Sequence, residues 1–106
     1  MTAPAVHEKG VQASVVHLAR LLGWAVFYVR DSRGSPAGWP DLVLIRDDRL
    51  LFRELKTDRG RLSPDQQRCR ERLEKTGADV GVWRPADWWT IEATLKGQLD
   101  LEDGGF

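Results

Sequence analysis

The chain has 106 residues, of which 42% are hydrophobic and 30% charged, and its formal net charge is zero at pH 7. This composition is typical of one soluble globular domain with a single core, and it excludes a disordered chain. The single cysteine, Cys69, excludes an internal disulfide and a cysteine-rich zinc site. The sequence has no apolar run of transmembrane length and no signal peptide, so we expect a cytoplasmic protein with no membrane contact.

The first half of the chain predicts one helix and three strands. Apolar residues recur at helical spacing over residues 6–23, which indicates a helix that ends at Gly23. Residues 24–30 are aromatic and β-branched, as in a buried strand, and residues 31–38 form a turn-rich loop. In that loop we expect Gly38 to provide a backbone conformation or a close approach that a side chain would block. Two further strands are predicted at 41–46 and 49–56, joined by a turn at 47–48.

The second half predicts a helix, a strand and a final helix. Ser63 has the properties of a helix cap, Pro64 suits the first turn, and Gln66 completes a capping box. The predicted helix runs to Gly77, a strand follows at 78–83, and a last helix begins near residue 87 and ends at residue 96. The order αβββαβα predicts an α/β fold in which helices flank a sheet, with a single domain over residues 1–98 and a flexible tail over 99–106.

Charged residues stand within the most strand-like part of the chain. If the turn at 47–48 is symmetric, Val43 faces Phe52 across the hairpin, and Asp41 faces Glu54. Strand alternation adds Lys56 to the same face. The local sequence therefore predicts that two carboxylates lie together with an ammonium group beside them.

Two interpretations account for these opposed carboxylates, which repel each other. In the first, Lys56 and Arg53 neutralise them within a structural network of ion pairs. Arg53, however, alternates to the other face of its strand and leaves one cation for two anions. A divalent cation of the magnesium or manganese type, which prefers hard oxygen ligands, resolves the repulsion better. The pattern therefore favours a metal site over the network.

These residues resemble the signature of the PD-(D/E)XK nuclease superfamily, which is Pro40-Asp41 followed by Glu54-Leu55-Lys56 on the next strand. The surrounding sequence resembles one branch of it, the VRR-Nuc (virus-type replication-repair nuclease) family. The segments that carry this resemblance, in order, are Gly38-Trp39-Pro40-Asp41-Leu42, "GRLSPDQ" at 60–66 and "LEKTGADVGVW" at 73–83. The similarity extends from Glu8 to Trp89.

The resemblance implies a restriction-endonuclease-like core and a Mg²⁺- or Mn²⁺-dependent deoxyribonuclease, an endonuclease in particular. Asp41 and Glu54 would bind the metal together with the backbone carbonyl of Leu55. Lys56 would orient the attacking water and stabilise charge on the phosphate. These roles agree with general chemistry, because a metal lowers the pKa of bound water and a nearby cation stabilises developing negative charge.

Two further positions each have a simple and a functional interpretation. Glu8 extends the apolar line of the first helix toward the sheet. An acidic residue suits a helix N-terminus in any case, but the resemblance implies that Glu8 joins the metal ligands. Gln66 completes a capping box, and it also matches the family's glutamine near the catalytic lysine. For Gln66 both roles can hold at once.

Seven basic residues are spread from the third predicted strand into the next helix: Arg53, Lys56, Arg59, Arg61, Arg68, Arg70 and Arg72. A solvated surface is their simplest interpretation, although the predominance of arginine favours phosphate contact. We expect Arg59 and Arg61 to bind DNA, together with Arg33 in the loop 31–38. Arg68 and Arg72 share one helix face and Arg70 lies roughly opposite, so these three cannot all contact one duplex.

The resemblance also implies a substrate class and an assembly. Short members of the family resemble enzymes of DNA repair and recombination that cut branched DNA, including four-way (Holliday) junctions, as homodimers. A unit of 106 residues offers little surface for a whole junction, whereas a two-fold dimer presents two active sites. Two alternatives remain open. One is an inert nucleic-acid-binding module that keeps the nuclease fold, and the other is an interaction domain whose acidic cluster is a surface feature.

Overall fold

The computed structural model describes residues 8–29 and 37–97, and within its first helix it describes side chains from Gly10 onward. The expected order αβββαβα is confirmed, with one additional 3₁₀ turn before the last helix. Arg33 and the tail 99–106 lie outside the described residues. The elements are α1 (Glu8–Leu21), β1 (Ala25–Tyr28), β2 (Leu42–Arg46), β3 (Arg49–Leu55), α2 (Pro64–Lys75), β4 (Asp79–Trp83), η1 (Pro85–Asp87) and α3 (Trp88–Lys96).

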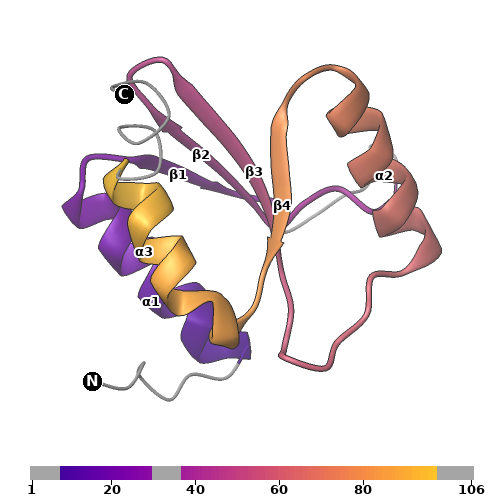
Figure 1. The fold of residues 1–106 in the computed structure, drawn as a ribbon, viewed down its shortest axis with the longest axis horizontal. Helices are drawn as coiled ribbons and strands as arrows, with labels where there is room; N and C mark the ends of the chain where they lie inside the picture. The colour runs from indigo at the N-terminus through magenta and orange to yellow at the C-terminus, as the bar shows by residue number, and fades with distance from the viewer. Residues whose placement is uncertain (1–7, 30–36, 98–106) are drawn as a thin grey trace.

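The four strands form one mixed sheet in the order β1-β2-β3-β4, antiparallel except for the parallel pair β3–β4 (Figure 1). The expected hairpin register is confirmed, since Val43 pairs with Phe52. The β2–β3 ladder ends at the pair Leu42–Arg53. Asp41 lies one residue before that pair and Glu54 one residue after it, so the hairpin brings these two positions to the same end of the sheet.

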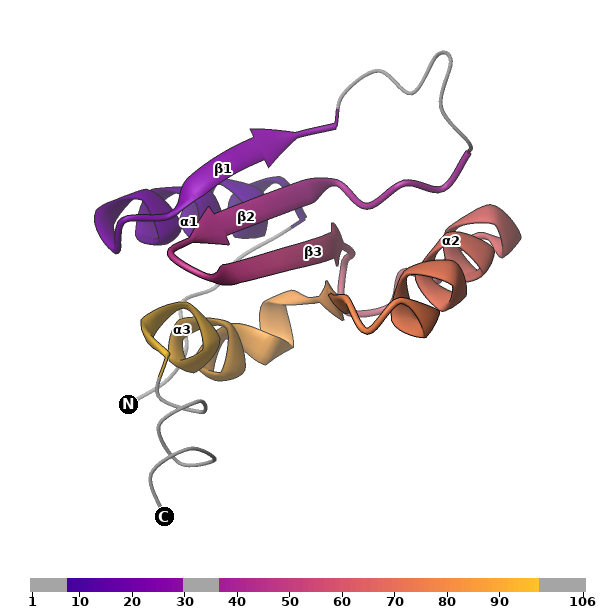
Figure 2. The same ribbon diagram turned by 90° about the horizontal axis from the view of Figure 1, so that it is seen from above.

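The helices cover the two faces of the sheet unequally. Helices α1 and α3 lie together on one face, and α2 lies on the other, against β4 (Figures 1 and 2). The hydrophobic core fills the space between the sheet and the pair α1–α3; its fully buried members include Val11, Val15, Leu42, Leu44, Leu51, Ile91 and Leu95. The expectation of an α/β fold with a mixed sheet flanked by helices is confirmed.

Part of the second sheet face remains exposed. The register places Phe27, Ile45 and Leu50 on the face away from α1 and α3, because Phe27 pairs with Val43 and Ile45 pairs with Leu50. Their relative exposures are 52%, 40% and 44%. We call these three residues the outer sheet face. None of the three is charged, whereas 30% of the residues in the whole chain are charged.

None of the helices in the described part of the chain combines the length and apolarity that a membrane crossing requires.

Candidate active site

Asp41 is held at the point where β1 and β3 end and β2 begins. Its carboxylate oxygen Oδ2 accepts a hydrogen bond of 2.8 Å from the backbone N–H of Leu55. Its backbone carbonyl accepts one of 3.0 Å from the N–H of Val29. Within the described residues no group donates to the second carboxylate oxygen, Oδ1. Asp41 is therefore fixed from two sides and still presents one oxygen that could bind a cation.

Glu54 is buried, with 6% of its surface exposed, on the sheet face that α2 covers. It lines a narrow space between the sheet and α2 together with Pro40 and Gln66. A carboxylate buried to this degree is costly unless a partner or a metal compensates its charge. Pro40, which precedes Asp41, and Gln66 thus line the same space as Glu54.

Arg53 does not supply that compensation, because it faces the opposite side of the sheet. Its Nη2 forms an ion pair of 2.7 Å with Asp79, and its guanidinium lies 4.8 Å from the ring centroid of Trp83. Gly81 lies beside this side chain, where a Cβ would be in ordinary van der Waals contact, 3.7 Å from Nε of Arg53. Burial lowers the pKa of Arg53, and the charge of Asp79 opposes that shift. An ion-pair network at the carboxylates would therefore have to form without Arg53.

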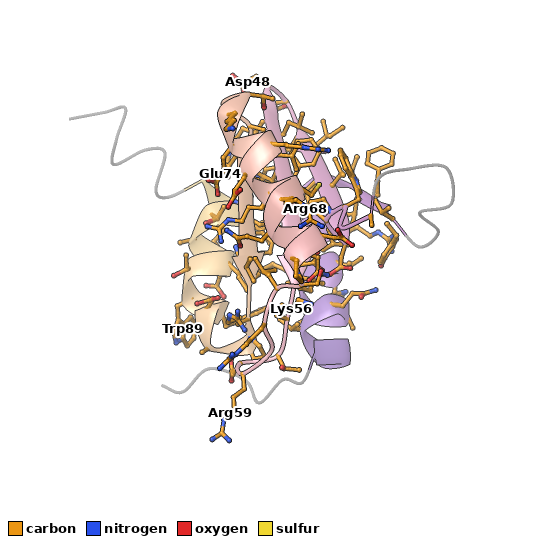
Figure 3. All side chains as sticks on the ribbon, turned by 90° about the vertical axis from the view of Figure 1, so that its right-hand side faces the viewer. Asp48, Lys56, Arg59, Arg68, Glu74 and Trp89 are labelled. Atoms are coloured by element: carbon orange, nitrogen blue, oxygen red, sulfur yellow. The ribbon has the colours of Figure 1, made fainter. Side chains whose placement is uncertain are left out.

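Lys56 follows β3 directly and continues its pairing with β4, since its N–H donates to the carbonyl of Trp83 at 3.1 Å. Strand alternation places its side chain on the same face as that of Glu54. The stem of this half-buried side chain runs beside the next loop, where a Cβ at Gly60 would lie 3.5 Å from its Cδ. In Figure 3, which looks onto α2, Lys56 projects between Arg59 below it and Arg68 on the helix.

Gly38 determines how closely the Pro40-Asp41 segment approaches α2. Its φ is +92°, and a Cβ there would lie 2.3 Å from the carbonyl oxygen of Asp65 and 2.6 Å from the nitrogen of Gln66. Both expected reasons for this glycine, the backbone conformation and the close approach, are confirmed. The first turn of α2 is therefore packed directly onto the segment that presents Asp41.

Gln66 has the capping role that the sequence predicted. Its Oε1 accepts from the N–H of Ser63 at 2.8 Å, and its own N–H donates to Oγ of Ser63 at 3.1 Å. Because Oε1 is used by the cap, the amide nitrogen Nε2 is the part of Gln66 that could act on a substrate. The cap also fixes the orientation of this side chain beside Glu54.

The donor set fits a hard divalent cation. Asp41 and Glu54 provide carboxylate oxygens at adjacent strand ends, and the Leu55 carbonyl follows Glu54 directly in sequence. Among the described residues no group of three or more His, Cys, Asp and Glu side chains comes together as a metal site. Glu8, the remaining expected ligand, begins α1, but its side chain lies outside the described residues.

The arginines of this region fall into separate groups. Arg59 and Arg61 are exposed in the loop that follows Lys56. Arg68 and Arg72 line a groove of about 400 Å³ along α2, whereas Arg70 lines the narrow space beside Glu54 and pairs with Glu74 at 2.7 Å. Arg70 thus lies on a different side of α2 from Arg68 and Arg72, as expected, but nearer to the carboxylates than its sequence position indicated.

The groove along α2 also contains Trp39 and Cys69. The ring of Trp39 meets that of Phe52 edge to face, with 5.6 Å between centroids. Burial raises the pKa of the Cys69 thiol, and the nearby positive charge of Arg72 opposes that shift. Cys69 is therefore a packing residue of α2, as its inward position on the helix indicated.

A mixed sheet with two carboxylates and a following lysine at one end is an arrangement expected of the nuclease class. The comparison with protein families supports that class, because the VRR-NUC domain matches residues 6–87. The chain therefore belongs to the VRR-NUC domain family.

Two solved structures of VRR-NUC domains show the same fold. A structure described as "VRR_NUC domain" is 26% identical over 96% of this chain and 100% of its own, with a TM-score of 0.67. A "VRR_NUC domain protein" is 22% identical over 92% of each chain, with a TM-score of 0.70. A third, Archaeoglobus fulgidus Hjc, a Holliday junction resolvase, is 26% identical over 70% of this chain and 64% of its own, with a TM-score of 0.48. No curated protein sequence matches the chain.

Proposed function

We propose that the protein is a Mg²⁺- or Mn²⁺-dependent endonuclease that hydrolyses phosphodiester bonds in DNA. The observation that carries this proposal is the charge arrangement at the end of the β2–β3 hairpin. Asp41 and Glu54 lie at that end of the sheet, Lys56 follows Glu54 on the same strand face, and Arg53 is turned away and paired with Asp79. Two carboxylates with an ammonium group beside them suit a site that binds a cation and a phosphate.

In this proposal Asp41, Glu54 and the Leu55 carbonyl hold the metal, and Glu8 is a further candidate ligand. A bound metal of this type lowers the pKa of its water and polarises a phosphoryl oxygen. Lys56 contributes positive charge where the phosphate gains negative charge, and it can orient the attacking water. Nε2 of Gln66 can donate to the same water or to a phosphate oxygen, since its Oε1 is fixed in the helix cap.

We further propose that the substrate is branched DNA, such as a four-way junction, and that the protein acts as a homodimer. The outer sheet face supports the dimer, because Phe27, Ile45 and Leu50 form an exposed, uncharged surface on one side of the sheet. A surface without basic residues is unsuited to phosphate contact and suits a second copy of the chain. A two-fold dimer would present two active sites to a two-fold substrate.

Cleavage assays on a panel of DNA substrates test the proposed function. Linear, flap, splayed and four-way substrates are incubated with the protein and manganese, and the products are separated by size. We expect wild type to cut a branched substrate, and Asp41→Asn and Lys56→Ala to lose cleavage while they keep DNA binding in calcium. Binding without cleavage in wild type would indicate an inert nucleic-acid-binding module, and neither binding nor cleavage would indicate an interaction domain.

A further inference from the structure

The loop that follows Lys56 has no helix or strand to hold it, although it carries Arg59 and Arg61. It spans residues 57–62, between Lys56, which follows β3, and Ser63, the cap of α2. Its own backbone contributes one turn, in which the N–H of Gly60 donates to the carbonyl of Thr57 at 3.2 Å. An exposed loop of this kind is expected to be mobile unless groups outside it fix its backbone.

Arg84 supplies such groups from the segment that links β4 to η1. Its Nη1 donates two hydrogen bonds, one of 2.7 Å to the carbonyl of Thr57 and one of 2.5 Å to that of Gly60. These are the two carbonyls on either side of Asp58 and Arg59, so a single guanidinium nitrogen closes the turn. Hydrogen bonds from a charged donor are stronger than those between neutral groups.

Asp58 makes the reciprocal contact from the loop to η1. Its Oδ1 accepts a hydrogen bond of 2.8 Å from the N–H of Ala86. Arg84 is itself oriented, because its backbone N–H donates to Oδ2 of Asp87 at 2.9 Å. The segment is anchored in the core on both sides by Trp83 and Trp88, which are 4% and 9% exposed. The bonds of Arg84 and Asp58 across this junction form what we call the loop clamp.

The clamp acts on the site through Lys56. Gly60 packs on this residue, since a Cβ there would lie 2.9 Å from Oγ1 of Thr57 and 3.5 Å from Cδ of Lys56. The carbonyl of Gly60 is also the one that Arg84 holds at 2.5 Å. Loss of the clamp would release the backbone beside the lysine stem and the two arginines that follow it.

We propose that Arg84 and Asp58 are positioning residues for catalysis, because the loop clamp fixes Lys56, Arg59 and Arg61 relative to the scissile phosphate. This inference rests on the proposed nuclease function. Neither residue belongs to the signature that the sequence shares with known nucleases, and Arg84 is distant from the loop in sequence, 27 residues after Thr57.

The charges of the two residues make the inference testable. Arg84→Met removes a positive charge, whereas Asp58→Ala removes a negative one. If they acted only through attraction of DNA, the two variants would change cleavage in opposite directions. If the two residues act through the clamp, both substitutions lower the cleavage rate at saturating DNA. The expected loss is roughly tenfold to a hundredfold, as for a misplaced catalytic group. Asp58→Asn keeps an acceptor for the N–H of Ala86 and should restore most of the rate, although it lacks the charge.

Asp48→Ala serves as the matched control, because it removes the same charge from the exposed hairpin turn, at the opposite end of the molecule from Arg59 (Figure 3). We expect its cleavage rate to remain that of wild type. The inference would be overturned if Asp58→Ala and Asp58→Asn cut at equal rates. It would also be overturned if Asp58→Ala cut faster than wild type while Arg84→Met cut more slowly.

Limited proteolysis tests the clamp without reference to activity. Trypsin cuts after arginine, and the bonds after Arg59 and Arg61 lie in the clamped loop. We expect Arg84→Met and Asp58→Ala to accelerate cleavage at these bonds, and Asp58→Asn to stay close to wild type, at a temperature where all variants remain folded. An unchanged digestion rate in both disrupting variants would refute the clamp. A clamp shown by proteolysis, in a protein that cuts no DNA, would instead refute the proposed function.

Discussion

The backbone N–H of Leu55 donates a 2.8 Å hydrogen bond to Oδ2 of Asp41, across the end of the β2–β3 hairpin. The same contact fixes the carboxylate and orients it toward β3, which carries Glu54 and is followed by Lys56. An asparagine at position 41 could keep this bond through its side-chain oxygen. Substitution there should therefore change the charge of the site with little change in its geometry.

This relationship leads to a prediction about metal and stability. Asp41→Asn should unfold at the temperature of metal-free wild type or higher, because it removes a repulsion with Glu54. Manganese at about 100 times its Kd should stabilise wild type by about 2.7 kcal/mol. For a domain of this size that is a rise in Tm on the order of 10 °C. Asp41→Asn should lose most of this response. Calorimetry with and without manganese measures both effects. The opposite result, a strongly destabilised variant and no metal effect in wild type, would favour an ion-pair network.

The contact of Gly38 with α2 predicts that alanine substitutions at two glycines, both with positive φ, differ strongly in their cost to stability. Gly38→Ala forces a Cβ to within 2.3 Å of backbone, whereas a Cβ on Gly77, which has a φ of +84°, would meet nothing within 4 Å. Gly77→Ala should cost only the conformational strain, about 1 kcal/mol. Gly38→Ala should cost about 3 kcal/mol or more, since overpacking adds to the strain. Denaturant unfolding measures both changes in the free energy of unfolding. Equal losses would show that α2 moves away to accommodate the Cβ at position 38.

The outer sheet face predicts where a dimer would be disrupted. Leu50→Lys places a charge among Phe27 and Ile45 and should convert a dimer into a monomer, because a buried lysine without a partner is costly. Leu21→Lys is the control, since Leu21 is 70% exposed on α1. Light scattering at micromolar concentration gives the mass. A dimer that persists in Leu50→Lys would locate the interface elsewhere, and a monomeric wild type would exclude the dimer under these conditions.

The exposed loop predicts which arginines contact phosphate. Arg59→Ala and Arg61→Ala should each weaken DNA binding for all sequences alike, and each should reduce the slope of log affinity against log salt by about one unit. Arg20→Ala on α1 is a better control than a variant of Arg70, which lies beside Glu54. Binding is measured on one branched substrate in calcium, which prevents cutting. Slopes that match wild type in both loop variants would place the DNA on another surface.

Local sequence is sufficient to predict the elements and the hairpin register. The turn at 47–48 lies between two apolar strands, so only one symmetric pairing keeps Val43 opposite Phe52 and the core positions on one face. That register also predicts that Arg53 turns away from Glu54. The capping box of Ser63 and Gln66 is equally local, and the structure contains it.

Contacts between segments distant in sequence are not predictable in this way. The pairing of Arg53 with Asp79 depends on how β4 aligns beside β3, which no hairpin turn determines. The bonds of Arg84 depend on the path of the chain after β4. Arginine on a surface gives no signal that distinguishes a donor to backbone carbonyls from a phosphate ligand. The loop clamp therefore becomes visible only in three dimensions.

The burial of Cys69 has a practical consequence for spectroscopy. This residue is 9% exposed, and burial raises the pKa of its thiol, so at neutral pH it holds little of the thiolate that reacts with maleimides. A cysteine introduced by Asp48→Cys would lie on the exposed turn, remote from the loop that carries Arg59 and Arg61. A fluorophore or spin label could be attached there selectively, without removal of the native cysteine. If the protein forms the proposed dimer, distances between two such labels would then follow the separation of subunits as DNA is added.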